Sequence, residues 1–226
     1  MTAAGARARV RAELTREIVD AARRHLATDG AAGLSLRAVA RELGMASSAV
    51  YRYFASRDEL LTALIVDAYE ALGAAAEEAE SAVARDDLRG RWRATCTAAR
   101  EWALAHPHEY ALVYGSPVPG YAAPEATIAP ASRVGVLLCR AVADGVAAGA
   151  IAPEPDGSAA GDALTPGVAE RLGLPPALAP RVVTAWSSLY GAISFELFGQ
   201  THNVVDDNAA YFDAAVERLA ELVLLP

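Results

Sequence analysis

The chain has 226 residues and a formal net charge of -8 at neutral pH, with 54% hydrophobic but only 7% aromatic residues. Much of the hydrophobic content is alanine, and because alanine is the best helix former, this composition favours an all-α fold with a sizeable core. Cys96 and Cys139 lie far apart and match neither a disulfide framework nor a metal-ligand pattern, so we expect two reduced, buried thiols.

The hydropathy pattern excludes an obvious membrane protein. The longest uncharged apolar runs are well short of the roughly 18 residues that a spanning helix needs, and no signal peptide precedes Arg7. We therefore predict a cytoplasmic protein with no membrane partner and no cofactor.

Charge is distributed unevenly along the chain. Residues 1–57 carry ten arginines against five acidic residues, a balance of +5, whereas residues 58–226 carry ten arginines against 23 acidic residues, a balance of -13. This pattern predicts a basic head that is steered toward phosphate and an acidic body that is kept away from it. All 20 basic residues are arginine, which favours bidentate contacts with phosphate.

The first eleven residues, MTAAGARARVR, lack a core pattern, and we interpret them as a mobile arm. Their three arginines, Arg7, Arg9 and Arg11, would either reach the backbone or minor groove of DNA or form a solvated basic tail. A first helix is predicted from about Ala12 to Thr28.

Residues 34–57 are typical of two short helices joined by a tight turn, a helix-turn-helix. Apolar residues in the first helix recur at i, i+3, i+4 and i+7, and Ser35 is placed to cap its N-terminus. Gly44 is expected to turn the chain in the left-handed conformation, with Met45 filling the corner. The second helix starts near Ser47 and presents a small, polar and basic side. Such a side suits the major groove of DNA, because small residues let the backbone approach the base edges.

The segment from Ile18 to Ile65 resembles the DNA-binding domain of the tetracycline-repressor (TetR) family of transcriptional regulators, with dense and correctly spaced matches. Three departures are mild: His25 replaces an apolar residue, Met45 a valine and Arg57 a lysine. The matching positions are Ile18, Ala21, Ala22, Gly30, the L-S-L-R run from Leu34, Val39, Ala40, Leu43, Gly44, Val50, Tyr51, Tyr53, Phe54 and the run from Arg57 to Leu60.

The resemblance implies a set of DNA contacts on residues 1–57, the predicted DNA-binding domain. The two tyrosines would donate hydroxyls to phosphates at the edges of the groove, and the small residues at the start of the second helix would face base edges. The arginines would hold phosphates or guanine. The residues expected to contact DNA are Arg37, Ser47, Ser48, Ala49, Tyr51, Arg52, Tyr53 and Arg57.

Ser56 and Glu59 form a predicted capping box for a long helix from Arg57 to about Ala84, which we expect to carry movement between head and body. A proline-rich loop is predicted at residues 116–130, and a poorly structured stretch with one turn near Val168 at residues 152–180. The other predicted helices span about residues 86–106, 107–115, 125 or 131 to 148, 179–200 and 206–224.

Residues 58–226 are predicted to sense a small-molecule effector and to dimerise. Aromatic residues at helical spacing, with one cysteine beside them, would line a cavity between the middle helices, although such residues are more often plain core. The residues expected to bind this ligand are Trp92, Cys96, Trp102, Tyr110, Tyr114, Trp186, Tyr190 and Phe195, with Tyr121 nearby.

The segment from Trp186 to Gly199 is similar to the tryptophan-histidine-glycine (WHG) type of regulatory C-terminal domain found in one branch of the family, with Tyr190 in the place of the histidine. In the family the last two helices of each subunit pack into a four-helix dimer interface, so the resemblance implies a homodimer formed through these helices. An apolar stripe is predicted on the final helix, comprising Ala210, Ala214, Ala215, Leu219 and Val223.

The resemblance therefore implies a sequence-specific DNA-binding regulator, a repressor that a small-molecule ligand releases from a palindromic operator on double-stranded DNA. Activation is an open alternative to repression. Two other hypotheses stay open: a dimeric helical ligand-binding module whose head no longer binds DNA, and a helical enzyme with such a head. Against an enzyme, the sequence contains no paired carboxylates at fixed spacing, no nucleophile elbow, no glycine-rich phosphate loop and no metal cluster.

Overall fold

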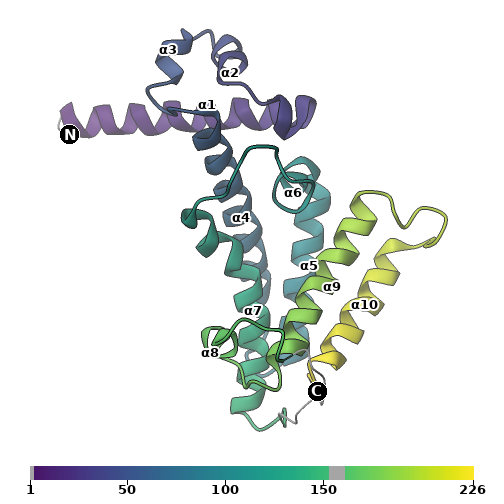
Figure 1. The fold of residues 1–226 in the computed structure, drawn as a ribbon. Helices are drawn as coiled ribbons and strands as arrows, with labels where there is room; N and C mark the ends of the chain where they lie inside the picture. The colour runs from purple at the N-terminus through teal and green to yellow at the C-terminus, as the bar shows by residue number, and fades with distance from the viewer. Residues whose placement is uncertain (1–2, 153–160) are drawn as a thin grey trace. The chain divides into compact units, whose positions relative to one another are not determined.

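The computed structural model describes residues 3–152 and 161–226, and every regular element in these ranges is a helix (Figure 1). The all-α prediction is confirmed. The chain forms two compact units: the first comprises the residues up to Tyr69 together with His106–Ile128, and the second comprises Glu70–Ala105 with Ala129–Pro226. A functional division after residue 57 stays a prediction, whereas the compact units divide elsewhere because residues from 106–128 pack against the core of the head.

The first unit begins with α1, Ala3–Gly33, which is interrupted near its end by Gly30 with a φ of 67°. The sequence predicted a mobile arm over residues 1–11, but the chain is helical from Ala3 onward, so this prediction is wrong for the described part of the arm. Alanine and arginine are strong helix formers, and they extend α1 well beyond its buried face. The prediction for residues 1–2 lies outside the described residues.

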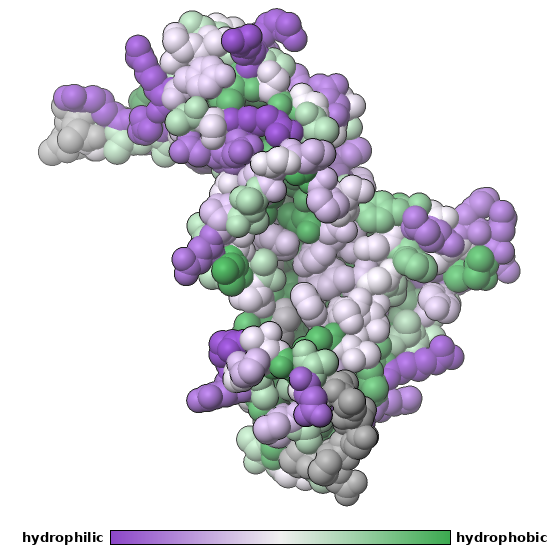
Figure 2. Space-filling model, in the orientation of Figure 1, coloured by the Kyte–Doolittle hydropathy of each residue, from purple (hydrophilic) through white to green (hydrophobic). Residues whose placement is uncertain are grey.

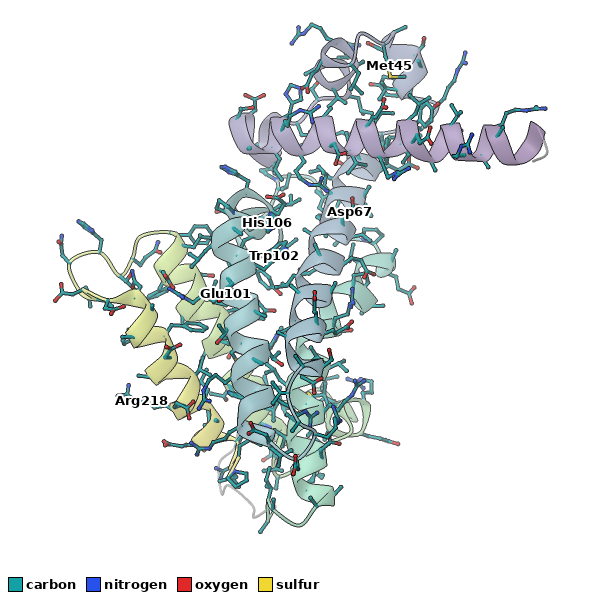
Figure 3. The ribbon with its side chains drawn as sticks, turned by 180° about the vertical axis from the view of Figure 1, so that it is seen from behind. Met45, Asp67, Glu101, Trp102, His106 and Arg218 are labelled. Carbon is teal, nitrogen blue, oxygen red and sulfur yellow. The ribbon has the colours of Figure 1, made fainter. Side chains whose placement is uncertain are left out.

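Two short helices complete the helix-turn-helix: α2, Leu36–Glu42, and α3, Ser47–Val50. Gly44 has a φ of 63°, as its predicted role requires, and Met45 lies at the corner (Figure 3), where its amide donates to the Ala40 carbonyl at 2.8 Å. Ser35 occupies the N-cap position of α2, but its side chain makes no capping hydrogen bond. The turn is therefore fixed by backbone conformation and packing rather than by a side-chain cap.

The long helix α4, Arg57–Ser81, belongs to both units and starts with a variant of the predicted capping box, in which Glu59 accepts from the residue before Ser56. The Glu59 amide donates to the Ser56 hydroxyl at 3.1 Å, and the Glu59 carboxylate accepts from the Ala55 amide at 2.5 Å. This arrangement satisfies two backbone donors where α4 begins.

The first unit is closed by α6, Pro107–Tyr114, and the 3-10 turn η1, Glu125–Thr127. Glu109 on α6 pairs with Arg23 on α1 at 3.4 Å, and the hydroxyls of Thr62 and Tyr121 lie 2.9 Å apart. Leu112, Val118 and Tyr121 pack against the core formed by α1 to α4. The head is thus built from two separate stretches of sequence.

The second unit holds the end of α4, α5 (Leu88–Ala105), α7 (Ile128–Ala147), α8 (Val168–Leu172), α9 (Ala179–Leu197) and α10 (Asn208–Leu222). Pro130 lies in the first turn of α7, where its missing amide is not needed. The turn predicted near Val168 is confirmed as α8. Other predictions for residues 153–160 lie outside the described residues.

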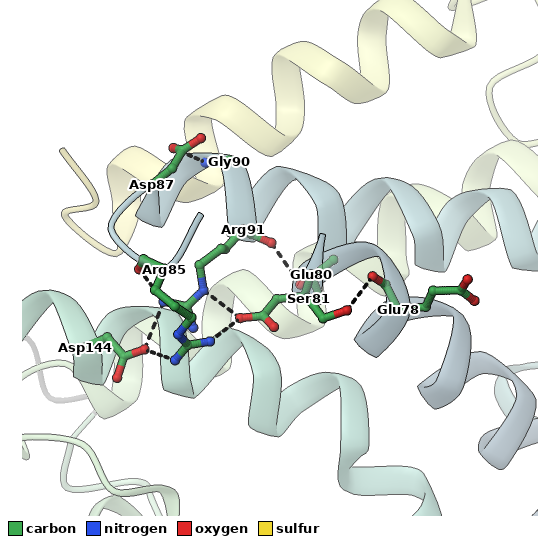
Figure 4. A network of polar contacts seen from close by, with 9 residues as sticks. Glu78, Glu80, Ser81, Arg85, Asp87, Gly90, Arg91 and Asp144 are labelled. Atoms are coloured by element: carbon green, nitrogen blue, oxygen red, sulfur yellow. Dashed lines mark hydrogen bonds and ion pairs between the residues drawn. The ribbon is translucent and has the colours of Figure 1, made fainter. Parts of the chain in front are cut away.

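An ion-pair network centred on the buried Arg91 and Glu80 joins three helices of the second unit (Figure 4). Arg91 on α5 is 0% exposed, and its guanidinium donates to Glu80 at 2.6 Å and to Asp144 at 2.8 Å. Arg85 bonds the same two carboxylates at 3.0 and 2.6 Å. Because Glu80 lies in the last turn of α4 and Asp144 lies on α7, this network fixes the α4–α5 turn against α7.

Among the described residues, the segment Glu125–Ala147 is long and apolar enough to cross a membrane, judged by length and composition alone. It is not an uncharged run, because Arg133 and Arg140 interrupt it. Of its most apolar window, 44% is buried inside the protein. Helices in a protein core can have the same length and composition, and the partial burial of α7 is consistent with a core helix.

Candidate nucleic-acid interface and ligand cavity

The predicted DNA-contacting residues on α2, on α3 and in the turn of residues 51–53 that follows α3 share one feature, an accessible polar or small side chain. Ser48, Arg52 and Arg37 are exposed, Tyr51 is 44% exposed, and Ser47, Ala49 and Tyr53 are half-buried. The local fold explains the exposure: Val50 and Phe54 are buried in the head core, so the residues between and before them face away. The structure thus presents a compact surface of hydroxyl and guanidinium groups.

Arg57 is engaged within the head. Its guanidinium donates to the carbonyls of Ala31 at 2.7 Å, Ala32 at 3.3 Å and Leu34 at 3.1 Å. The sequence suggested a direct phosphate contact here, whereas these bonds close the end of α1 against the start of α4. These carbonyl partners are neutral, but the guanidinium also lies 3.9 Å from the Asp58 carboxylate, which partly offsets its positive charge at the N-terminus of α4.

Tyr53 is also held by a contact that the sequence did not indicate. The guanidinium carbon of Arg11 lies 5.1 Å from the centroid of the Tyr53 ring, and an Arg11 nitrogen donates to the Arg52 carbonyl at 3.2 Å. Local sequence could not indicate this contact, because Arg11 and Tyr53 are far apart in the chain and are brought together only by the fold.

The predicted ligand-binding residues are distributed over both units of the chain. Trp92, Cys96 and Trp102 on α5 are 1%, 0% and 8% exposed, and the Trp92 indole donates to the Val216 carbonyl at 3.3 Å. They belong to the core of the second unit. Phe195, in contrast, is 59% exposed on α9.

Tyr110 and Tyr114 lie on α6 in the first unit, where their ring centroids are 5.0 Å apart. Tyr69 meets Tyr114 edge-on at 5.9 Å, and burial raises the pKa of Tyr69. Tyr190 is buried on α9, with its ring 6.2 Å from that of Trp186.

The second unit does contain an apolar cavity of about 240 Å³, between α7, α8 and α9. Of the predicted ligand-binding residues, only Trp186 lines it. The sequence missed the other members because they are small or aliphatic and are recognisable only once the helices are placed. The lining comprises Ala131, Ser132, Gly135, Val136, Cys139, Val168, Leu172, Val182, Val183 and Trp186.

Polar chemistry in this cavity is sparse. The Ser132 hydroxyl donates to the Ala129 carbonyl at 2.8 Å, so it retains only the capacity to accept a further hydrogen bond. Burial raises the pKa of Cys139 to about 11. The Cys139 side chain is therefore a neutral thiol at neutral pH and contributes apolar surface rather than a nucleophile.

Next to the cavity, α7 is tied to α4 through Arg133. Its guanidinium pairs with the Glu77 carboxylate at 2.9 and 2.5 Å and donates to the Glu70 carbonyl at 2.9 Å. The hydrogen bond from Arg133 lowers the pKa of Glu77. Gly73 lies beneath this contact, where a Cβ atom would come within 2.7 Å of the Arg133 side chain. The glycine thus permits a close crossing of α4 and α7.

An exposed stripe runs along α9 and continues past its end. Thr184, Ser188, Gly191, Phe195 and Phe198 follow one another at helical spacing, and all are exposed except Gly191, which is half-buried. Figure 2 shows hydrophobic surface at the α9–α10 turn. On α10, Tyr211 is 50% exposed and Arg218 points outward (Figure 3), whereas Val216 and Phe212 are buried.

The predicted apolar stripe of α10 is divided between surface and core. Ala210 and Ala214 are exposed, Ala215 and Leu219 are half-buried, and Val223 is buried. The helix therefore packs on α5 and α9 through a neighbouring face. Within residues 3–152 and 161–226, no group of three or more histidine, cysteine or acidic side chains is arranged to hold a metal ion.

Comparison with known proteins matches both parts of the chain to families. The family described as bacterial regulatory proteins, tetR family, matches residues 18–64, and the family described as tetracyclin repressor-like, C-terminal domain, matches residues 92–219. The HTH-type transcriptional regulator Rv1816 of Mycobacterium tuberculosis is 42% identical over 231 residues, covering 97% of this chain and 96% of the relative. A counterpart in Mycobacterium bovis, Mb1846, has the same identity and coverage.

Solved structures of other proteins also match this chain. A crystal structure described as that of a regulatory protein, SCO4313, is 35% identical, with a TM-score of 0.78 over 94% of this chain and 98% of that chain. RolR in complex with resorcinol has a TM-score of 0.54 over 97% of both chains, but at 18% identity the likeness shows the fold alone.

Proposed function

Because the chain belongs to the tetracycline-repressor family of transcriptional regulators, we propose that it is a cytoplasmic repressor that binds a palindromic operator as a homodimer and leaves it when a small-molecule effector binds. The exposed polar surface made by Ser48 on α3 and by Tyr51 and Arg52 in the turn after it carries this proposal, because it lies on a head with a balance of +5 over residues 1–57. That surface combines groups for base edges with groups for phosphates.

We assign the contacts residue by residue. Ser47, Ser48 and Ala49 face base edges, because their small side chains let α3 approach the floor of the major groove. Tyr51 and Tyr53 donate to phosphates at the edges of the groove, while Arg37 and Arg52 add charge. Arg57 positions α4 against α1 and supports a phosphate at the start of α4 with its charge and the first amides.

Selection of bound fragments from random duplex DNA by the purified protein tests the proposal. We expect a palindrome with half-sites about one helical turn apart. In Tyr51→Phe each subunit loses one hydroxyl donor worth about 1 kcal/mol, so affinity for that palindrome should fall about 30-fold for the dimer. Fluorescence anisotropy measures both proteins, with a scrambled half-site as control. No enrichment by the wild type at low salt would contradict operator binding.

Dimerisation through α9 and α10 is supported by Gly191. Glycine within a helix costs about 1 kcal/mol relative to alanine, yet a Cβ built on Gly191 meets nothing within 4 Å in the chain. A second copy of the chain would explain a glycine at this position, because a small residue lets the helices of two subunits approach closely. The exposed rings of Phe195 and Phe198 continue the same stripe and provide apolar area for such a contact.

The effector is proposed to enter the cavity between α7, α8 and α9. An apolar cavity of about 150 Å³ holds benzene, so the larger volume here suits about ten carbon atoms. The lining favours an uncharged molecule with at most one or two polar groups, such as a hydroxyl that donates to Ser132. A charged group would lose hydration without a partner.

The effector must bind the DNA-incompetent state more tightly than the DNA-competent state, because otherwise it would not change the affinity for the operator. Displacement of α7 would reach α4 through Arg133, whose bonds to Glu70 and Glu77 join the two helices. Since α4 continues into the head without interruption, a change in its direction would alter the separation of the two heads on DNA.

Filling the cavity tests this assignment. Gly135→Leu places an isobutyl group toward Trp186, whose indole nitrogen lies 3.9 Å from a Cβ built on Gly135. We expect operator affinity within about twofold of the wild type but no response to a panel of uncharged, hydroxylated compounds of about ten carbons. Gly135→Ala, the matched control, should keep the response. A full response in Gly135→Leu would place the effector elsewhere, and a wild type that no member of the panel releases would contradict this effector class.

A further inference from the structure

The N-terminal part of α1 extends beyond the core that it serves. No described residue before Ile18 is buried, and Val10 is 50% exposed. In Figure 2 hydrophilic side chains stand along this part of the helix. Helix propensity extends α1 to Ala3 without support from packing in the head, so the exposed Arg7 side chain is available for another contact.

This extension is attached to the end of the proposed recognition surface. Arg11 donates to the Arg52 carbonyl at 3.2 Å and stacks over Tyr53, with 5.1 Å between the guanidinium carbon and the ring centroid. A carbonyl just past a short helix lacks an intrahelical donor, so Arg11 satisfies it. The stacking also restrains the ring whose hydroxyl we assign to a phosphate.

Beside this contact lies an open concavity of about 430 Å³, lined by Ala6, Arg7, Val10, Arg11 and Tyr53. Arg7 and Arg11 are four residues apart and thus lie on one side of α1. Arg7 makes no hydrogen bond or ion pair with the described residues. Arg9 points to another side of the helix and pairs with Glu13 at 3.8 Å.

We infer that this concavity seats a phosphodiester of the DNA backbone adjacent to the phosphate bound by Tyr53. This inference rests on the proposed operator binding. The lining offers two guanidinium groups and a phenol but no carboxylate, which suits an anion. It offers no amide or carboxylate side chain to read a base, so the contact would add affinity without sequence preference.

The geometry sets the reach of this contact. From Arg11 to Arg7 the helix advances about 6 Å at 1.5 Å per residue. At 3.4 Å per phosphate along a strand, the phosphate in this concavity should therefore lie within about two nucleotides of the phosphate that Tyr53 binds.

A matched pair of variants tests this phosphate site, called the seat below, by fluorescence anisotropy on the selected operator at several salt concentrations. Arg7→Ala and Arg9→Ala remove the same charge from opposite sides of an exposed helix. We expect Arg7→Ala to weaken binding about fivefold to tenfold at 100 mM salt and to lower the slope of log K against log salt by about two, one phosphate in each subunit. Arg9→Ala should change affinity less than about twofold, and Arg7→Lys should restore most of the loss.

The outcomes separate this inference from the proposed function. Equal losses in Arg7→Ala and Arg9→Ala would show a diffuse charge effect and overturn the seat, as would an unchanged salt slope in Arg7→Ala. If the wild type itself selects no duplex, the proposed function fails together with the inference. If the wild type binds normally and only the Arg7 effect is missing, the seat alone fails.

Discussion

Replacing Gly191 with arginine is expected to convert the dimer into folded monomers and to weaken operator binding by about 10²- to 10⁴-fold, the range by which joining two binding modules raises affinity. The arginine would project from α9 into the space assigned to the second copy. Within one chain it meets nothing, because no atom lies within 4 Å of a Cβ at this position. Removing a helical glycine should even stabilise the monomer by about 1 kcal/mol.

Sedimentation equilibrium gives the oligomeric state and anisotropy gives the operator affinity. Ala147→Arg is the matched control, since it places the same charge on the exposed end of α7. It should remain dimeric and bind DNA like the wild type. A Gly191→Arg protein that stays dimeric would exclude this face of α9 from the interface, and a monomer with full affinity would contradict the requirement for two heads.

Arg91→Met is expected to lower the free energy of unfolding by about 3 to 5 kcal/mol, because it leaves the Glu80 carboxylate buried without its main partner. Glu80 is 6% exposed, and Arg91 donates to it at 2.6 Å. Arg85 bonds the same carboxylate, but its side chain is 62% exposed and screened by solvent. For a chain of this length, the Tm should fall on the order of 10 °C.

The double variant Glu80→Leu with Arg91→Met makes this prediction specific. It removes both buried charges while keeping apolar volume, and such exchanges are often neutral or stabilising. We therefore expect it to recover most of the stability that Arg91→Met loses, as measured by urea unfolding followed by circular dichroism. If the double variant is as unstable as the sum of the two single variants, the network acts through packing of the α4–α5 turn rather than through paired charge.

Most of the helices could be predicted because their ends depend on local chemistry. Gly44 takes a φ of 63°, and the Ser56 hydroxyl accepts from the Glu59 amide. Local chemistry failed at Ser35, where the position of the cap is right but the hydrogen bond is absent. The start of α1 was also predicted wrongly, because the prediction gave more weight to the missing apolar pattern than to the helix propensity of alanine and arginine.

The candidate sites were less predictable because they depend on distances between elements. Arg57 carries the expected charge, but its bonds to the carbonyls at the end of α1 appear only when α1 and α4 meet. The cavity is lined mainly by small and aliphatic residues such as Gly135 and Val182, which have no sequence signature. Trp92, one of the aromatic residues predicted to bind the ligand, is only 1% exposed and lies in the core.

The discontinuous head has a consequence for biosynthesis. Its core is completed by Leu112, Val118 and Tyr121, which follow α5 in the sequence. When Tyr69 has been synthesised, roughly 60 further residues must be added before the last residue of the first unit exists, which takes about 3 to 12 s at 5 to 20 residues per second. During that interval α1 to α4 lack the cover that α6 provides. A nascent chain therefore completes the first unit only after the whole of α5, which belongs to the second unit, has been synthesised.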